Sequence, residues 1–304
     1  LIKGGNKIYN IQNFFKYVGS NNIEKVNEML NNGSITDINV TFNNGETALH
    51  ISSRAGNINL VKLILQKDAN VNMKDNSQRT PLHWACDEGH TEVVKALMEK
   101  EVDIHAKESV YQWTPLHLAC VKGHTNVVIE LLERSADINV RDKDQRTPLH
   151  WACFHGHTEV AKALMEKGAD THVMDNDQRT PLHLACSTGR TEVAMALIER
   201  GAEINSIDNN QKTPLLIACE YGYTEVAMAL VERGANIHME DNEGMTPLHW
   251  ACSAAAASDI RNLDLAKKLI AKGGDINARN KYGRTPIDYA GKNRELLQQT
   301  AYNR

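Results

Sequence analysis

One short phrase recurs along this chain at a nearly constant interval, and this repetition constrains the fold more than any other feature of the sequence. The phrase is T-P-L-H-x-A-C or a variant of it, and its copies begin at Thr47, Thr80, Thr114, Thr147, Thr180, Thr213, Thr246 and Thr285. Successive copies start 33, 34, 33, 33, 33, 33 and 39 residues apart. A period of this length indicates small supersecondary units stacked in a row, each in contact only with its neighbours.

A 33-residue period that carries T-P-L-H-x-A resembles the ankyrin repeat, which consists of a β-turn followed by two antiparallel helices. The resemblance covers nearly the whole 304-residue chain. It implies an all-α solenoid of stacked helix-turn-helix units joined by β-hairpin loops. We expect one array over residues 1–304, with a degenerate N-terminal capping repeat at 11–46, seven repeats at 47–284 and a C-terminal capping repeat at 285–304.

The copy that begins at Thr147 shows how one repeat specifies its structure. Thr147 is placed to cap the first helix, and Pro148 follows at the first helical position, where a missing N–H costs nothing. Gly156 predicts the end of that helix, and Thr158 is expected to cap the second helix, which Gly168 ends. A 3.6-residue period then predicts the buried face of the second helix as Val160, Ala163, Leu164 and Met165.

Several copies depart from this pattern. Glu101 and Ser135 stand where other copies have Gly at the end of the second helix, and a non-glycine residue forced to positive φ costs about 1 kcal/mol. We therefore expect these two repeats to be the weaker ones. The hairpin at Tyr111-Gln112-Trp113 has one extra residue. The copy at Thr246 has six, which predict a longer first helix and loop.

The six cysteines all occupy the same repeat position: Cys86, Cys120, Cys153, Cys186, Cys219 and Cys252. Equivalent residues of stacked helices lie roughly 8–10 Å apart, whereas a disulfide needs Cα atoms within about 7 Å. The thiols are therefore expected to be free and buried as small apolar residues. Six unpaired thiols favour the cytoplasm or another reducing compartment, and no Cys/His spacing suits zinc.

The positions of the thirteen histidines argue against catalysis and metal binding. Six belong to T-x-L-H, where the imidazole is expected to bond the capping Thr and nearby backbone: His50, His83, His117, His150, His183 and His249. Six more recur in G-H-T turns or in hairpins two repeats apart, and only His155 lacks a repeat role. Motifs for nucleophiles, phosphate loops, dinucleotides and zinc proteases are absent. The sequence thus predicts no enzymatic activity, no cofactor and no metal.

Bulk composition excludes two classes of partner. A formal net charge of −4 gives no basic surface for nucleic acid. No apolar run approaches the length of a membrane span. The chain lacks an initiator Met, so we expect it to be part of a longer protein, and we expect the isolated array to be a monomer.

The residues that differ between copies are the candidates for binding a partner, because the shared residues build the framework. The resemblance to ankyrin repeats implies that ligands lie on the concave face, formed by hairpin tips and first helices, and we expect the variable residues there. Aromatic and arginine residues dominate interface energetics. The predicted partner-binding residues are Arg79, Trp84, Tyr111, Trp113, Lys122, Arg146, Trp151, Phe154, His155, Arg179, Tyr221 and Trp250. The tryptophans within T-P-L-H-W either border this groove or only pack, whereas Trp113 and Phe154 are expected to be exposed.

The predicted anchor is a central patch flanked by Arg146 and Arg179, and it consists of Trp113, Trp151, Phe154 and His155. We expect a non-catalytic scaffold that binds another protein, as a peptide segment or a folded partner, on this face. One alternative is a small-ligand or nucleotide sensor that uses Trp113, Phe154, Arg146 and Lys122. Another is an autoinhibitory or mechanical segment of a larger protein.

Overall fold

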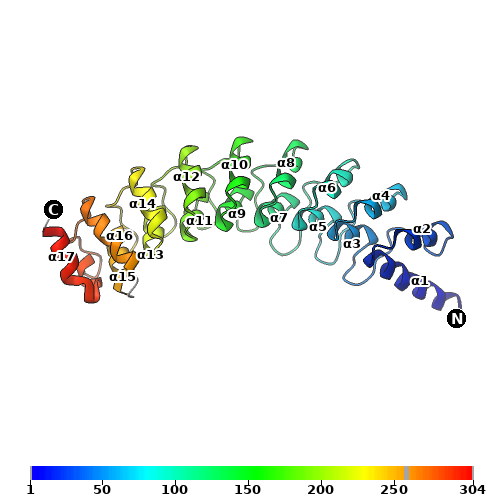
Figure 1. Ribbon diagram of the computed structural model, residues 1–304, viewed down its shortest axis with the longest axis horizontal. Coiled ribbons are helices and arrows are strands. Elements are labelled where there is room, and N and C mark those ends of the chain that lie inside the picture. The colour runs from blue at the N-terminus through cyan, green and yellow to red at the C-terminus, as the bar shows by residue number, and fades with distance from the viewer. Residues whose placement is uncertain (1, 257–259, 303–304) are drawn as a thin grey trace. The chain divides into compact units, whose positions relative to one another are not determined.

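The protein divides into two compact units, residues 1–144 and 145–304, in a computed structural model that describes residues 2–256 and 260–302. Figure 1 shows that each unit is a row of helix pairs. The helices of the first unit are α1 (Ile2–Gly19), α2 (Ile23–Asn31), α3 (Ala48–Arg54), α4 (Ile58–Gln66), α5 (Pro81–Glu88), α6 (Thr91–Met98), α7 (Pro115–Lys122) and α8 (Thr125–Glu133).

The second unit continues the same alternation of first and second helices. Its helices are α9 (Pro148–His155), α10 (Thr158–Glu166), α11 (Pro181–Ser187), α12 (Thr191–Glu199), α13 (Pro214–Glu220), α14 (Thr224–Glu232), α15 (Pro247–Ala256), α16 (Ile260–Ala271) and α17 (Arg294–Tyr302), with 3-10 turns η1 (Pro286–Tyr289) and η2 (Gly291–Asn293) before the last. The all-α solenoid class predicted from the repeat is confirmed, whereas the single array over residues 1–304 stays a prediction.

Each first helix starts where the T-P-L-H phrase predicts. In α5, Thr80 is the N-cap, and its backbone N–H donates to His83 Nδ1 at 3.1 Å while its hydroxyl lies 2.9 Å from the same nitrogen. Pro81 occupies the first turn. The helix ends at Gly89, whose φ of +79° is the left-handed conformation that glycine adopts without strain. A side chain there would also collide with His124, which lies within 2.5 Å of an added Cβ.

The predicted cap of the second helix is wrong by one residue. Helix α10 begins at Thr158, and its N-cap is His157, which makes no side-chain capping bond. The reversal at Gly156 is tight, because the Thr158 N–H bonds the Gly156 carbonyl at 3.0 Å, and Thr158 is therefore already the first residue of the helix. The buried face also shifts, because Ala161 is buried and Ala163 only half-buried.

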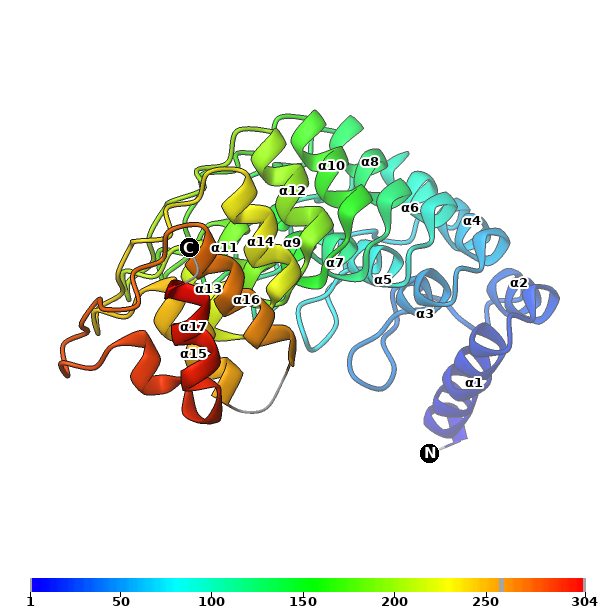
Figure 2. The ribbon, with the colours of Figure 1, turned by 60° about the vertical axis from the view of Figure 1, so that its left-hand side comes forward.

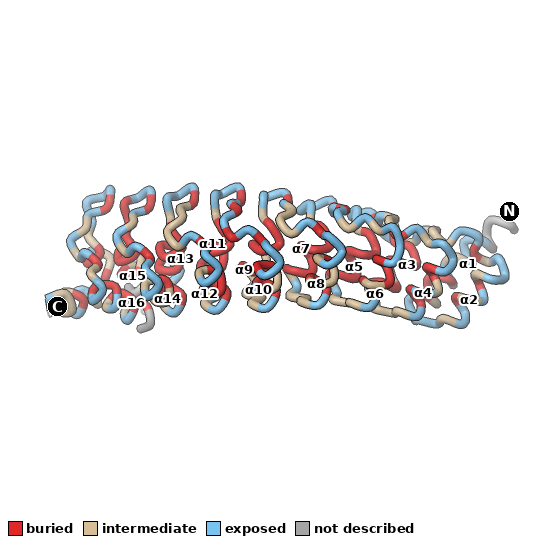
Figure 3. The backbone as a smooth tube through the Cα atoms, turned by 90° about the horizontal axis from the view of Figure 1, so that it is seen from above, coloured by how far each residue is buried: buried red, intermediate tan, exposed pale blue. Residues whose placement is uncertain are grey.

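Like helices stack on like helices within each unit. In the second unit α9, α11, α13 and α15 pack in series, and so do α10, α12, α14 and α16, which Figure 2 shows side by side. Buried residues follow the packed faces, whereas most turn tips are exposed (Figure 3). No repeat encloses its apolar face alone, so the burial that stabilises each helix pair is supplied by its neighbours.

All six cysteines are free and fully buried, as predicted. Burial raises the pKa of the Cys252 thiol to about 12, and it raises the pKa values of Cys86, Cys120, Cys186 and Cys219 as well. Only a thiolate attacks an alkylating reagent. We therefore expect almost no labelling by a maleimide at pH 7 in the native state and labelling of all six thiols in urea, followed by mass spectrometry. Rapid native labelling of several cysteines would contradict this packing.

The hairpin loops between repeats are tight turns rather than strand pairs. In the first such turn, the Asp75 N–H donates to the Arg79 carbonyl at 2.9 Å, and the Asp75 carboxylate accepts the N–H groups of Ser77 and Arg79 at 2.8 and 2.9 Å. Neighbouring turns are joined by one backbone bond, such as Ser109 N–H to Ser77 carbonyl at 3.0 Å. Within the described residues the only β pairing is the single bridge between Phe42 and Glu46.

The two residues that stand in place of glycine, Ser135 and Glu101, adopt different backbone conformations. Ser135 has a φ of +66°, as predicted, and carries the expected cost of about 1 kcal/mol. Glu101 is not among the residues with positive φ, so that prediction is wrong. Helix α6 ends at Met98 and spans 8 residues where α10 spans 9, and this earlier exit lets the chain pass Glu101 without a left-handed residue.

The ends of the chain differ from the inner repeats. The N-terminal helix pair is present, but α1 starts at Ile2, well before the predicted residue 11, and spans 18 residues. At the C-terminal end the first helix shrinks to the 3-10 turn η1. The insertion after Thr246 lengthens α15 to 10 residues, as predicted, while residues 257–259 of its loop lie outside the described part of the chain.

Candidate functional site

The residues predicted to contact a partner lie on the turns and on the first helices of the two units. Tyr111, Lys122 and Tyr221 are exposed. The others are half-buried: Arg79, Trp84, Trp113, Arg146, Trp151, Phe154, His155, Arg179 and Trp250. The predicted exposure of Trp113 and Phe154 is therefore only partly correct, because each side chain also packs against its own repeat. For each unit we call the surface made by the turns and the C-terminal halves of the first helices its tip face.

The tryptophans of T-P-L-H-W brace the turns while keeping one side open. The Trp84 indole N–H donates to the buried carboxylate of Asp75 at 3.0 Å, and Arg79 lies over the ring at 4.7 Å. Trp250 repeats this arrangement with Asp241 at 2.9 Å, and the Lys212 amine lies 4.6 Å from its ring. These rings therefore have a structural role, and their half-buried state leaves part of each available on the tip face.

Trp113 links two successive turns of the first unit. Its indole N–H donates to Asp142 at 3.0 Å, and Asp142 is buried. The side chain that is left exposed is Tyr111, which stacks on Trp113 at 4.7 Å and is 51% exposed. An indole that satisfies a buried carboxylate is part of the framework. The available aromatic surface here is the tyrosine.

The second unit holds a continuous aromatic cluster, Trp151, Phe154 and His155. Trp151 lies 6.0 Å from Phe154 in an edge-on arrangement and 6.1 Å from His155 in a stacked one, and Phe154 and His155 are 5.2 Å apart. Arg146 covers one side of Trp151 at 5.0 Å. Of the predicted central patch, these three residues come together on one unit, whereas Trp113 belongs to the other.

The arginines beside this cluster are already paired. Arg146 bonds Asp175 at 3.1 Å, and Arg179 bonds the same carboxylate at 3.3 Å and Asp177 at 2.5 Å. Burial of Asp175 opposes its ionisation, but its hydrogen bonds with Arg179 and Arg146 outweigh this and lower its pKa. The guanidinium charges are therefore neutralised within the protein.

The cations of the first unit are engaged in the same way. The Asp87 carboxylate forms ion pairs with Arg79 at 3.4 Å and with Lys122 at 3.7 Å. The Lys122 side chain is still about half exposed. In the second unit Lys212 pairs with Glu220 at 2.7 Å, directly before Tyr221, which is 60% exposed. The cations beside these aromatic rings are thus engaged in charge pairs.

The buried acidic residues of the turns were not predicted from the sequence. They are Asp75, Glu108, Asp142, Asp175, Asp208 and Asp241, and each accepts backbone N–H groups of its own turn. The sequence does contain a signal for them. An acidic residue stands six positions before Thr114 and five positions before the Thr of five other T-P phrases, which are Thr80, Thr147, Thr180, Thr213 and Thr246. Their role is to position the turn, and through it the residues that flank it.

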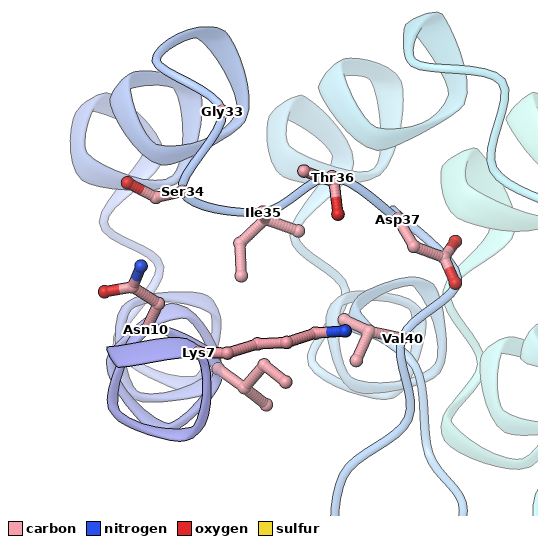
Figure 4. Close-up of a pocket in the computed structure, with 9 residues that line it drawn as sticks. Lys7, Asn10, Gly33, Ser34, Ile35, Thr36, Asp37 and Val40 are labelled. Carbon is pink, nitrogen blue, oxygen red and sulfur yellow. The ribbon is translucent and has the colours of Figure 1, made fainter. Parts of the chain in front are cut away.

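Two further hollows lie away from the predicted site. The first unit has a cavity of about 360 Å³ where Lys7 of α1 extends across toward Val40 (Figure 4), and its wall also includes Asn10, Ile11, Gly33, Ser34, Ile35, Thr36 and Asp37. The second unit has an open hollow of about 950 Å³ along α14, whose lining includes Glu225, Glu232, Asp264 and Lys268 together with apolar and aromatic side chains. None of the predicted partner-binding residues lines either one. Among the described side chains, no group of three His, Cys, Asp or Glu is placed to hold a metal ion.

The comparisons with known proteins agree with the repeat geometry. In the described part of the chain, no helix is long and apolar enough to cross a membrane. The family model for ankyrin repeats (3 copies) matches residues 14–108, 103–175, 167–241 and 200–280. A search of curated proteins found no match. Ankyrin repeats are generally protein–protein interaction modules without enzymatic activity. Because the matches span most of the sequence and the helix pairs follow the same period, the chain belongs to the ankyrin repeat family.

Proposed function

We propose that this protein is a non-catalytic scaffold that binds another protein, as a peptide segment or a folded partner, on the concave face of its repeats. The observation that carries the proposal is the aromatic cluster of Trp151, Phe154 and His155 on the tip face of the second unit, together with the exposed ring of Tyr221. Aromatic side chains are enriched at protein interfaces, and Trp and Tyr are frequent hot spots of binding energy.

The variable positions support this assignment because the framework does not require these rings. The position of Phe154 is taken by Asp87, Val121, Ser187 and Glu220 in other copies, and each of those copies forms the same helix. Phe154 and Tyr221 therefore add contact surface without being needed for the fold. Aromatic rings supply large contact areas with only two side-chain torsions to fix on binding.

A nucleotide-binding role is less well supported, because phosphate binding needs cations that are free to leave their present partners. Arg146 is held by the buried carboxylate of Asp175, and Lys122 lies beside Asp87. A phosphate would have to displace a carboxylate from each of them. For the compartment, we propose the cytoplasm or another reducing environment, in which six free thiols persist.

The proposal predicts that Phe154→Ala combined with Tyr221→Ala removes partner capture while the fold persists. Loss of two interface rings should weaken binding at least tenfold, since hot-spot truncations cost about 2 kcal/mol or more. Capture from a lysate of the source cells would identify the partner, and calorimetry would then measure its affinity. The control is Tyr302→Ala, which removes a ring that is 87% exposed on α17.

Equal affinity of both variants for the partner would place the binding surface elsewhere. Trp113→Ala is not suited to this experiment, because the Trp113 indole N–H donates to the buried carboxylate of Asp142. Loss of binding by that variant would not separate a contact from a defect in folding.

A further inference from the structure

Five successive turns place a glutamine in a conformation that glutamine adopts only under strain. The φ angles are +61° for Gln78, +61° for Gln112, +62° for Gln145, +59° for Gln178 and +59° for Gln211. The two turns that follow place Gly244 and Gly283 at the same position, with φ of +72° and +73°. Left-handed backbone at a residue with a side chain costs conformational energy that glycine does not incur.

The backbone role of this position does not require glutamine. The Gln178 and Gln211 N–H groups bond the carbonyls of Asp175 and Asp208 at 2.9 Å, and the Gly244 N–H bonds Asp241 at the same distance. Within the part of the chain that the structure describes, the carboxamides of Gln178 and Gln211 make no hydrogen bond, and both residues are exposed. Backbone strain is often found at ligand-binding sites, so a strained, exposed residue with an unused side chain is a candidate for one.

The spacing expected between these successive turns corresponds to a few residues of an extended peptide. Backbone bonds from Asn209 to Asp177 at 2.9 Å and from Asn242 to Asn210 at 3.0 Å hold successive turns one repeat apart. A repeat step of roughly 8–10 Å corresponds to about three residues of extended chain at roughly 3.3 Å each. Each carboxamide offers both a donor and an acceptor, so it can bond the N–H and the C=O of one peptide residue.

The surroundings favour recognition of main chain over recognition of charge. The residues after the two glutamines, Arg179 and Lys212, fold back and are neutralised by Asp175, Asp177 and Glu220. The rings of Phe154 and Tyr221 lie two repeats apart on the first helices of the same unit, a separation of about six extended residues. Uncharged amides on the turns and two rings at the ends of first helices of the same unit suit a peptide with two apolar side chains about six positions apart.

We propose that Gln178 and Gln211 form an amide ladder that binds the main chain of an extended peptide segment, while its apolar side chains contact the rings of the tip face. This inference rests on the proposed function and narrows it, because a peptide segment rather than a folded domain is the partner.

The test uses linear peptides of twelve residues, selected from a random displayed library against the full chain. For the selected peptides, Gln178→Gly with Gln211→Gly should weaken binding at least tenfold, while the Tm is equal to or above that of the wild type because strain is released. Gln112→Gly is the matched control, because its carboxamide already bonds the Glu108 carbonyl. It should leave the affinity unchanged.

Peptide variants with N-methylated backbones give a second readout. Removal of single N–H groups along the peptide should weaken binding with a period of three residues. Unchanged affinity of the double glycine variant, or the absence of this period, would overturn the ladder. If Phe154→Ala with Tyr221→Ala abolishes binding while the glycine variant does not, the proposed function stands and the ladder fails. If neither variant affects binding, the tip face itself is not the site.

Discussion

Lowering the pH from 7.5 to 4.5 should destabilise the first unit by roughly 2–3 kcal/mol through His83 alone. Burial is the main cause that lowers the pKa of His83 from 6.5 to about 4 in the folded protein. A histidine with a depressed folded pKa contributes stability that is complete above its unfolded pKa of 6.5. That stability is lost as the pH falls toward 4, because the unfolded chain binds the proton more tightly.

The hydrogen bonds of His83 explain why the ring must stay neutral. Nδ1 accepts the Thr80 N–H at 3.1 Å, so it cannot also carry a proton, and Nε2 donates to the Trp113 carbonyl of the next repeat at 3.2 Å. Protonation of Nδ1 would place its N–H opposite the Thr80 N–H in a buried site, where two donors cannot bond each other. It would thus break the cap of α5 and weaken the contact with the next repeat.

The same geometry recurs along the chain, so the effects accumulate. Burial also lowers the pKa values of His50, His183 and His249, each of which bonds its capping Thr and a carbonyl one repeat ahead. Urea unfolding followed by circular dichroism, at pH values from 7.5 to 4, should show stability falling most steeply between pH 6.5 and 4. Flat stability over this range would mean that these rings are not neutral in the fold.

The chain supplies its own control for this prediction. The copy at Thr213 has Leu216 where others have His, and there the Thr213 hydroxyl accepts the Leu216 N–H at 3.2 Å without a capping imidazole. His83→Leu should lower stability at pH 7.5 by about 1–2 kcal/mol, since two hydrogen bonds are lost. It should also reduce the further loss on acidification relative to the wild type. An unchanged pH dependence would show that other groups cause the acid sensitivity.

The framework was predictable because each copy repeats the same local chemistry. Thr147 and Pro148 start a helix and Gly156 ends it through backbone preferences that act within a few residues of sequence. Departures between copies were harder to interpret. Glu101 and Ser135 look alike in the sequence, yet only Ser135 is left-handed, because the length of the preceding helix decides the outcome.

The placement of the candidate residues on turns and first helices was predictable from the sequence, but their exposure was not. Trp113 differs between copies, as an interface residue would, yet its indole bonds Asp142, which lies 29 residues further along. Partners at such distances depend on how repeats stack, and periodicity alone does not specify them. Arg146 and Arg179 were likewise expected to face a partner, but both are directed to Asp175.

Replacing Glu108 with Asp should destabilise the protein by about 2–3 kcal/mol, although Asp is the residue that other turns use. Glu108 is 1% exposed, and its carboxylate accepts the N–H groups of Val110 at 2.8 Å, Tyr111 at 2.6 Å and Trp113 at 3.1 Å. This turn is one residue longer than that of Asp75. The additional methylene carries the carboxylate to N–H groups that the shorter side chain does not reach, and each buried donor left unpaired costs about 1–3 kcal/mol.

The structure identifies Val110 as the extra residue of the turn. Its deletion should therefore restore the stability that Glu108→Asp removes. Ser109 donates to the preceding turn and the Tyr111 carbonyl accepts from Lys143, as the second and third residues of other turns do, whereas the side chain of Val110 is 55% exposed. Deleting Val110 in the Glu108→Asp variant should therefore restore stability to within about 1 kcal/mol, while either change alone destabilises. Urea unfolding of the wild type, the two single variants and the double variant gives the coupling energy between the two changes, which should exceed about 2 kcal/mol. Additive losses would mean that the turn adapts to either acid and that the glutamate does not compensate for the longer loop.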